Sequence, residues 1–149
     1  MRSFLALLVA FALTFPGKAE TCTPFTNMRD HVLSNFAQAQ YEQREGLPSL
    51  AESFPGADRC LSRKASDGDP VARMQCYWSR DVENRFTVLL QDLKSCYPGW
   101  QEQERTEPSA LRQVILKQDE MRAGVWLVQL YKANTRVILM LVYMQKVKP

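Results

Sequence analysis

The stretch RCLSRKASDGDPVARMQCYW, residues 59–78, decides the fold predicted for this chain. Its centre, residues 65–70, favours a turn, because Asp side chains hydrogen-bond to nearby backbone groups and Pro cannot donate to a β-ladder. The runs on either side are short and extended, so the stretch predicts a β-hairpin. A hairpin centred on Gly68 places Cys60 opposite Cys76. Facing residues on paired strands lie about 4.5–5.5 Å apart at Cα, which is within reach of a disulfide bond.

Alternation along the second strand of this hairpin predicts two different faces. The apolar face, expected to lie in the core, carries Ala72, Met74, Cys76 and Trp78. The opposite face carries Arg73, Gln75 and Tyr77, and the same register sets Arg63 beside Arg73, a mildly unfavourable pair of like charges. Arginine and tyrosine are enriched at interface hot spots. These four residues are therefore the first candidate for partner binding.

A helix is predicted to follow the hairpin. Its apolar residues recur at helical spacing from Val82 to Tyr97, and Pro98 and Gly99 end it. Cys96 lies on the apolar stripe of the last turn. Trp100 follows the end of the helix and is a second candidate for binding, since it either packs onto the core or protrudes.

The first 19 residues are typical of a secretory signal peptide. Arg2 precedes an apolar run, Phe4 to Phe15, that is too short to span a bilayer comfortably, and Ala19 ends a small-residue cleavage site. We therefore expect export to the periplasm or the exterior, with residues 20–149 forming a single domain. The chain has 19 basic residues, of which Arg2 and Lys18 leave with the signal peptide, so 17 remain against 16 acidic ones. Such a balance argues against nucleic-acid binding, which needs a strongly basic surface.

All four cysteines lie in the exported part, as in small disulfide-bonded domains. The hairpin register favours Cys60–Cys76, which leaves Cys22–Cys96 to join the N-terminus to the end of the helix at 82–97. Metal binding is not expected, because no pair has C-x-x-C spacing and His31 is the only histidine. We predict no metal and no cofactor.

The rest of the exported chain predicts further helices and strands. Residues 20–25 are expected to be extended, Met28 to Arg44 helical, 50–54 a helical turn, and Gln101 to Pro108 an exposed loop. Three strands close the chain, at 111–118, 125–132 and 136–146. The last is apolar on both faces, which indicates a central strand. The predicted fold is therefore α+β, with about five antiparallel strands, a hairpin plus a three-stranded meander, and two main helices on one face.

Known catalytic motifs are missing from the sequence: it has no G-x-S-x-G, no P-loop and no histidine other than His31. The leading hypothesis is therefore a non-enzymatic exported protein that binds another protein or an envelope component, of the inhibitor or immunity type. One alternative is a carrier of a small apolar ligand, held between helices and sheet by Phe36, Phe86, Trp126 and Met140. Another is a hydrolase built on the carboxylates of Glu102, Glu104 and Glu107.

Overall fold

The computed structural model describes residues 18–51, 54–106 and 111–146, which form two helices and eight strands. This α+β architecture agrees with the predicted class, although the strands outnumber the five expected. In chain order the elements are α1 (Lys18–Leu33), β1 (Tyr41–Arg44), β2 (Leu47–Leu50), β3 (Arg59–Arg63), β4 (Val71–Trp78), α2 (Val82–Cys96), β5 (Gln101–Thr106), β6 (Arg112–Glu120), β7 (Gly124–Lys132) and β8 (Val137–Gln145).

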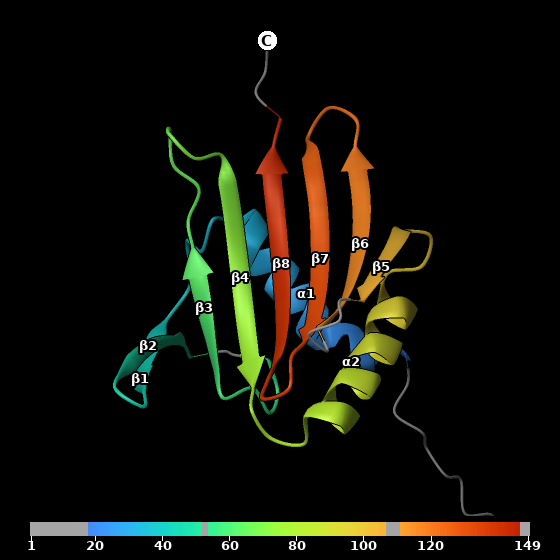
Figure 1. Cartoon of the computed structure of the whole chain (residues 1–149). Coiled ribbons are helices and arrows are strands. Elements are labelled where there is room, and N and C mark those ends of the chain that lie inside the picture. Colours follow the sequence, from blue (N-terminus) through green and yellow to red (C-terminus); the bar gives the residue numbers. More distant parts are fainter. Residues whose placement is uncertain (1–17, 52–53, 107–110, 147–149) are drawn as a thin grey trace, which may run out of the picture.

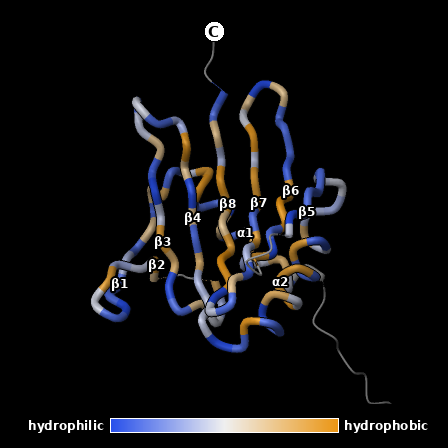
Figure 2. Tube along the Cα trace, in the orientation of Figure 1, coloured by the Kyte–Doolittle hydropathy of each residue, from blue (hydrophilic) through white to orange (hydrophobic). Residues whose placement is uncertain are grey.

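Six of these strands form one antiparallel sheet in the order β3-β4-β8-β7-β6-β5 (Figure 1). β8 pairs with β4 on one side and β7 on the other, so the prediction of a central strand is confirmed. Its run of six apolar residues, 137–142, stands out in the hydropathy colouring (Figure 2). β1 and β2 form a separate hairpin, and the Ser49 hydroxyl of β2 accepts a hydrogen bond of 3.0 Å from the Cys60 amide of β3.

The predicted register of the β3–β4 hairpin is confirmed. Cys60 faces Cys76 with Cα atoms 4.1 Å apart, and the two form a disulfide bond. Arg63 faces Arg73 three residue pairs further along. Cys22 and Cys96 form the second predicted disulfide, which joins the first turns of α1 to the last turn of α2.

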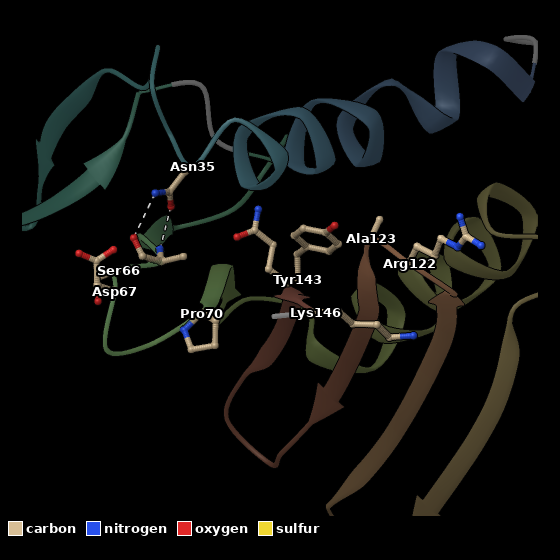
Figure 3. A pocket seen from close by; sticks show the side chains of 10 residues that line it. Asn35, Ser66, Asp67, Pro70, Arg122, Ala123, Tyr143 and Lys146 are labelled. Atoms are coloured by element: carbon tan, nitrogen blue, oxygen red, sulfur yellow. Dashed lines mark hydrogen bonds between the residues drawn. The ribbon is translucent and has the colours of Figure 1, made fainter. Parts of the chain in front are cut away.

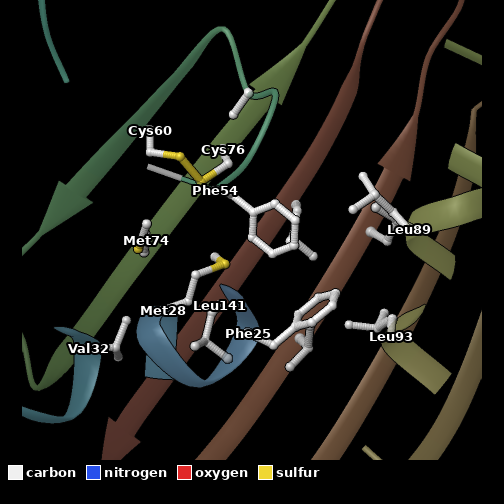
Figure 4. Close-up of a cluster of buried hydrophobic side chains, with 14 of the residues drawn as sticks. Phe25, Met28, Val32, Phe54, Cys60, Met74, Cys76, Leu89, Leu93 and Leu141 are labelled. Carbon is white, nitrogen blue, oxygen red and sulfur yellow. A yellow bond between two sulfur atoms is a disulfide. The ribbon is translucent and has the colours of Figure 1, made fainter. Parts of the chain in front are cut away.

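Both helices pack on one face of the sheet, here called the inner face, and Figure 1 shows α1 crossing behind the strands. Edge-on aromatic contacts run from Trp78 of β4 through Phe54 to Phe25 of α1, with ring centroids 5.5 and 4.9 Å apart. A third contact joins Phe25 to Tyr97, directly after α2. Figure 4 shows this core beside the Cys60–Cys76 disulfide, with Met28 and Val32 of α1 over β4 and β8 and with Leu89 and Leu93 of α2.

The prediction of a helix from Met28 to Arg44 is wrong at both ends. α1 begins at Lys18, so residues 20–25 are helical rather than extended, and the helix ends at Leu33. Asn35 and Phe36 then adopt left-handed φ angles of 51° and 58°, which a continuing helix does not allow. The Asn35 side chain stabilises this ending, because it accepts a hydrogen bond from the Ala65 amide and donates one to the Ala65 carbonyl.

Three further segments predicted as loop or helix are strands. Residues 41–44, the end of the predicted helix, and residues 47–50 form the β1–β2 hairpin. Leu50 therefore ends a strand, whereas we expected it in a helical turn. Gln101–Thr106 is the edge strand β5, although we expected a loop, because its backbone pairs with β6. Its exposed, charged side chains are typical of edge strands that resist further pairing.

The predicted signal peptide lies mostly outside the described residues. Lys18 and Ala19 are the first two residues of α1. Of the two helices in the described ranges, neither is long and apolar enough to cross a membrane.

Candidate functional site: the outer face of the sheet

The face of the six-stranded sheet opposite the helices is the candidate site, and we call it the outer face. On β4 the inner-face side chains are at most 3 % exposed, whereas the alternate ones remain partly exposed. The ladder registers extend this alternation to the neighbouring strands. The central part of the outer face consists of Leu61, Arg63, Arg73, Gln75, Tyr77, Gln113, Ile115, Lys117, Val125, Leu127, Gln129, Tyr131, Ile138, Met140, Val142 and Met144.

Two cross-strand rows at the centre of this face have the same composition on both sides of β8. In one row Met140 lies between Gln75 of β4 and Gln129 of β7. In the next row Ile138 lies between Tyr77 and Tyr131. The result is a strip of apolar side chains on β8 with glutamine and tyrosine along both edges.

Side-chain hydrogen bonds hold this arrangement in place. The Tyr77 hydroxyl donates to Gln75 Oε1 at 3.4 Å, and Gln75 Nε2 lies 3.0 Å from the sulfur of Met140. On the other edge the Tyr131 hydroxyl donates to Gln129 Oε1. Partial burial raises the pKa of Tyr131, and a hydrogen bond with Gln113 opposes that rise. The polar side chains of the strip are therefore ordered before any partner binds, which lowers the entropic cost of binding.

A cavity of about 230 Å³ opens at one end of the strip. Ile138, Met140, Gln75 and Tyr131 line it, together with Arg136 before β8 and with Leu111 and Ala133. Small-molecule sites typically measure about 300–1,000 Å³. This smaller hollow is better suited to one apolar side chain of a partner than to a complete ligand.

Basic residues surround the apolar strip. Arg73 and Lys117 lie in the row of Val142 and Leu127, one toward each edge of the sheet. The Arg59 guanidinium lies 5.4 Å from the centre of the Tyr77 ring, a distance typical of a cation–π contact. Arg63 pairs with Asp69 of the hairpin turn at 2.5 Å, so Asp69 offsets its repulsion from Arg73.

Four of the five residues predicted for binding lie together on the outer face. Arg63, Arg73 and Gln75 share a shallow hollow with Leu61 and Ser62, and Tyr77 follows in the next row. Trp100 lies elsewhere. It packs against Tyr97, with ring centroids 4.5 Å apart, at the edge of the core.

The β7 and β8 residues of this face were not among the predicted site residues, except Met140, which was predicted to line a ligand pocket. A signal for them was present: Gln-Cys-Tyr at 75–77 recurs as Gln-Leu-Tyr at 129–131, and residues 137–142 are apolar at every position. Neither pattern shows by itself which strands are neighbours.

The residues proposed to line an apolar carrier pocket do not share one. Phe36, Phe86 and Trp126 are at most 2 % exposed within the packed core, whereas Met140 lies on the outer face. The largest cavity described, about 640 Å³, is lined mainly by polar residues at the ends of α1, β3 and β6 (Figure 3). Asp67, Arg122 and Lys146 are among them.

The carboxylates considered for hydrolysis are engaged with cations. Glu102 pairs with Lys94 at 2.9 Å and Glu104 with Arg112 at 2.5 Å. The hydrogen bond from Arg112 lowers the pKa of Glu104, which is opposite to what a general acid needs. Glu107 lies outside the described residues.

Fold and site together define a small α+β domain with two disulfide bonds and one sheet face that neither of the two described helices covers. No protein-family model matches the sequence, and no curated protein matches it.

Proposed function

We propose that this chain is an exported, non-enzymatic protein that binds another protein or an envelope component through the outer face of its sheet. The observation that carries this proposal is the apolar strip of β8, edged by ordered glutamine and tyrosine and surrounded by arginine and lysine. Protein interfaces have the same layout, with an apolar centre, a polar rim and enrichment in tyrosine, methionine and arginine.

Two observations support export. Disulfide bonds persist in oxidising compartments, and Cys22–Cys96 and Cys60–Cys76 are both formed. The first 19 residues have the pattern of a signal peptide. An inhibitor or immunity protein is the kind of binder that fits a small, rigid, exported domain.

A binding role also agrees with the state of the acidic residues. A carboxylate that acts as a general acid near neutral pH needs a raised pKa, as apolar surroundings provide. The hydrogen bond from Arg112 lowers the pKa of Glu104 instead, and Glu102 forms an ion pair with Lys94.

Capture from the cell envelope with three forms of the protein tests this proposal. The mature protein is immobilised as wild type, as Met140→Glu and as Met121→Glu. Met140 lies in the strip, whereas Met121 is 88 % exposed in the turn between β6 and β7 and provides a matched control. We expect a partner that binds wild type and Met121→Glu and is lost with Met140→Glu. Equal capture by all three folded proteins would exclude the strip as the binding surface.

A further inference from the structure

We infer that the partner is a protein whose contact surface presents one apolar side chain surrounded by carboxylates. This inference rests on the proposed function, because it specifies what the outer face binds. It is carried by the distribution of charge over that face and by the size of the cavity at the end of the strip.

Charge on the outer face is strongly one-sided. The registers place Arg59, Arg63 and Arg73 toward the β3 edge and Lys117 and Arg105 toward the β5 edge. The acid that these ladders place on the face is Asp119, and Lys146 neutralises it at a distance of 2.5 Å. Within the described residues, Arg73, Arg105 and Lys117 form no ion pair. Since electrostatic complementarity selects partners, cations on both sides of an apolar strip select acids on both sides of an apolar anchor.

The cavity indicates what the partner places at the centre. Ile138 and Met140 of the strip line it, and so does Arg136, which precedes β8. With about 230 Å³ it accepts one large apolar side chain, and a carboxylate beside that side chain lies within reach of a guanidinium. Hot spots of protein interfaces are side chains seated in pockets of this kind.

Other occupants fit the charge pattern less well. A second copy of this chain would bring one cationic rim against another, which is unfavourable. Nucleic acid requires cations along a phosphate track, but here Val142, Leu127, Ile138 and Met140 occupy the centre. An anionic membrane attracts the rim, but the sheet presents a flat ladder of strands rather than an amphipathic helix able to enter the headgroup layer.

Selection of random peptides displayed on phage against the disulfide-bonded mature protein provides the test. Counter-selection uses the Ile138→Arg variant, in which a cation fills the cavity. We expect the enriched peptides to share a large apolar residue with several Asp or Glu residues nearby. A selection that enriches no peptide over the Ile138→Arg variant would overturn the inference.

Titration of one synthetic selected peptide then separates the two contributions. Ile138→Arg is expected to weaken binding at least about thirtyfold, and Arg73→Glu at least about tenfold. Arg122→Glu is the matched control, because Arg122 lines the polar cavity of Figure 3, and it should change affinity less than about twofold. Should Ile138→Arg unfold the protein, as judged by its circular dichroism, Met140→Glu replaces it.

The outcomes distinguish failure of this inference from failure of the proposed function. Peptides that depend on Ile138 but carry no acids and ignore Arg73→Glu would overturn the charge pattern and leave the binding face standing. Peptides that ignore both Ile138→Arg and Met140→Glu would overturn both. Arg73-dependent binding to phosphatidylglycerol vesicles or single-stranded RNA without peptide binding would overturn the inference, as would Ile138-dependent dimerisation seen by sedimentation.

Discussion

Tyr77 and Tyr131 lie on opposite sides of Ile138, in one row across three strands of the sheet. β4 and β7 both run antiparallel to β8, so they run in the same direction as each other. The Gln-x-Tyr sequence in each strand therefore places its glutamine beside Met140 and its tyrosine beside Ile138. Two copies of a short pattern thus frame one apolar strip.

The cations of the β3–β4 hairpin are expected to contribute little to the stability of the fold. Replacing Arg63 and Arg73 together by Ala removes a pair of facing like charges and also the exposed Arg63–Asp69 ion pair, two effects of up to about 1 kcal/mol that oppose each other. We expect the melting temperature to stay unchanged, and binding through the outer face to weaken. Arg73→Ala alone, which removes the like-charge pair but keeps the Arg63–Asp69 ion pair, should be slightly more stable than the double variant. A loss of several kcal/mol in the double variant would show that these arginines are structural.

Gly124 is expected to resist replacement by Ala. A Cβ atom at this position would lie 2.5 Å from the Tyr143 ring and 2.6 Å from the Met144 carbonyl oxygen, and that backbone atom cannot move aside without disturbing β8. We expect Gly124→Ala to lower the free energy of unfolding by about 1–3 kcal/mol. Urea denaturation measures this change.

Gly68 provides the matched control, because a Cβ atom there has nothing within 4 Å. Gly68→Ala should leave stability unchanged or raise it by up to about 1 kcal/mol. Equal losses at both positions would contradict the steric explanation.

The Cys22–Cys96 disulfide is expected to contribute strongly to stability, although both cysteines are only partly buried. It closes a separation of 74 residues, for which the chain-entropy model gives about 4 kcal/mol. Replacing both cysteines by Ser should lower the free energy of unfolding by that amount and reduce amide protection first in α1. A loss below about 1 kcal/mol in urea denaturation would contradict the entropic account.

Tyr97 is expected to make the fold sensitive to alkaline pH. Burial raises the pKa of Tyr97 from its ordinary value of 10.0 to about 12, although Arg29 opposes the rise. Because the folded state holds this proton more tightly than the unfolded state, the stability is fully present below pH 10 and is lost as pH rises toward 12. The loss amounts to about 3 kcal/mol if the unfolded chain has the ordinary pKa.

Comparison with Tyr97→Phe isolates this effect, since Phe keeps the ring but has no ionisable group. When the pH is raised from 9 to 11, the wild type should lose about 1–2 kcal/mol of stability relative to Tyr97→Phe. A difference that is the same at both pH values would show that Tyr97 does not titrate as described.

The sequence alone determined the features whose signals lie close together along the chain. A turn at residues 66–69 sets the register of β3 and β4, so Cys60–Cys76 and the Arg63–Arg73 pair were predictable from one stretch. Helical spacing predicted α2, alternation predicted β6, and a run that is apolar on both faces predicted β8.

Tertiary structure decided the segments in which local signals are weak or point elsewhere. α1 contains Pro24 and little amphipathic pattern, and it is held by the distant Cys96 and by burial of Phe25 and Met28. β5 was predicted to be a loop, and its side chains are all exposed. It forms a strand because its backbone pairs with the backbone of β6.

The candidate site was decided by tertiary structure for the same reason. The row Gln75–Met140–Gln129 joins residues from three strands far apart in sequence. Alternation is a local property of the backbone, so the sequence showed which side chains of β4 face away from the core. It did not show this for β8, because both faces of that strand are apolar. The order β4-β8-β7 brings those side chains into one surface, and that order arises from pairing across the whole sheet.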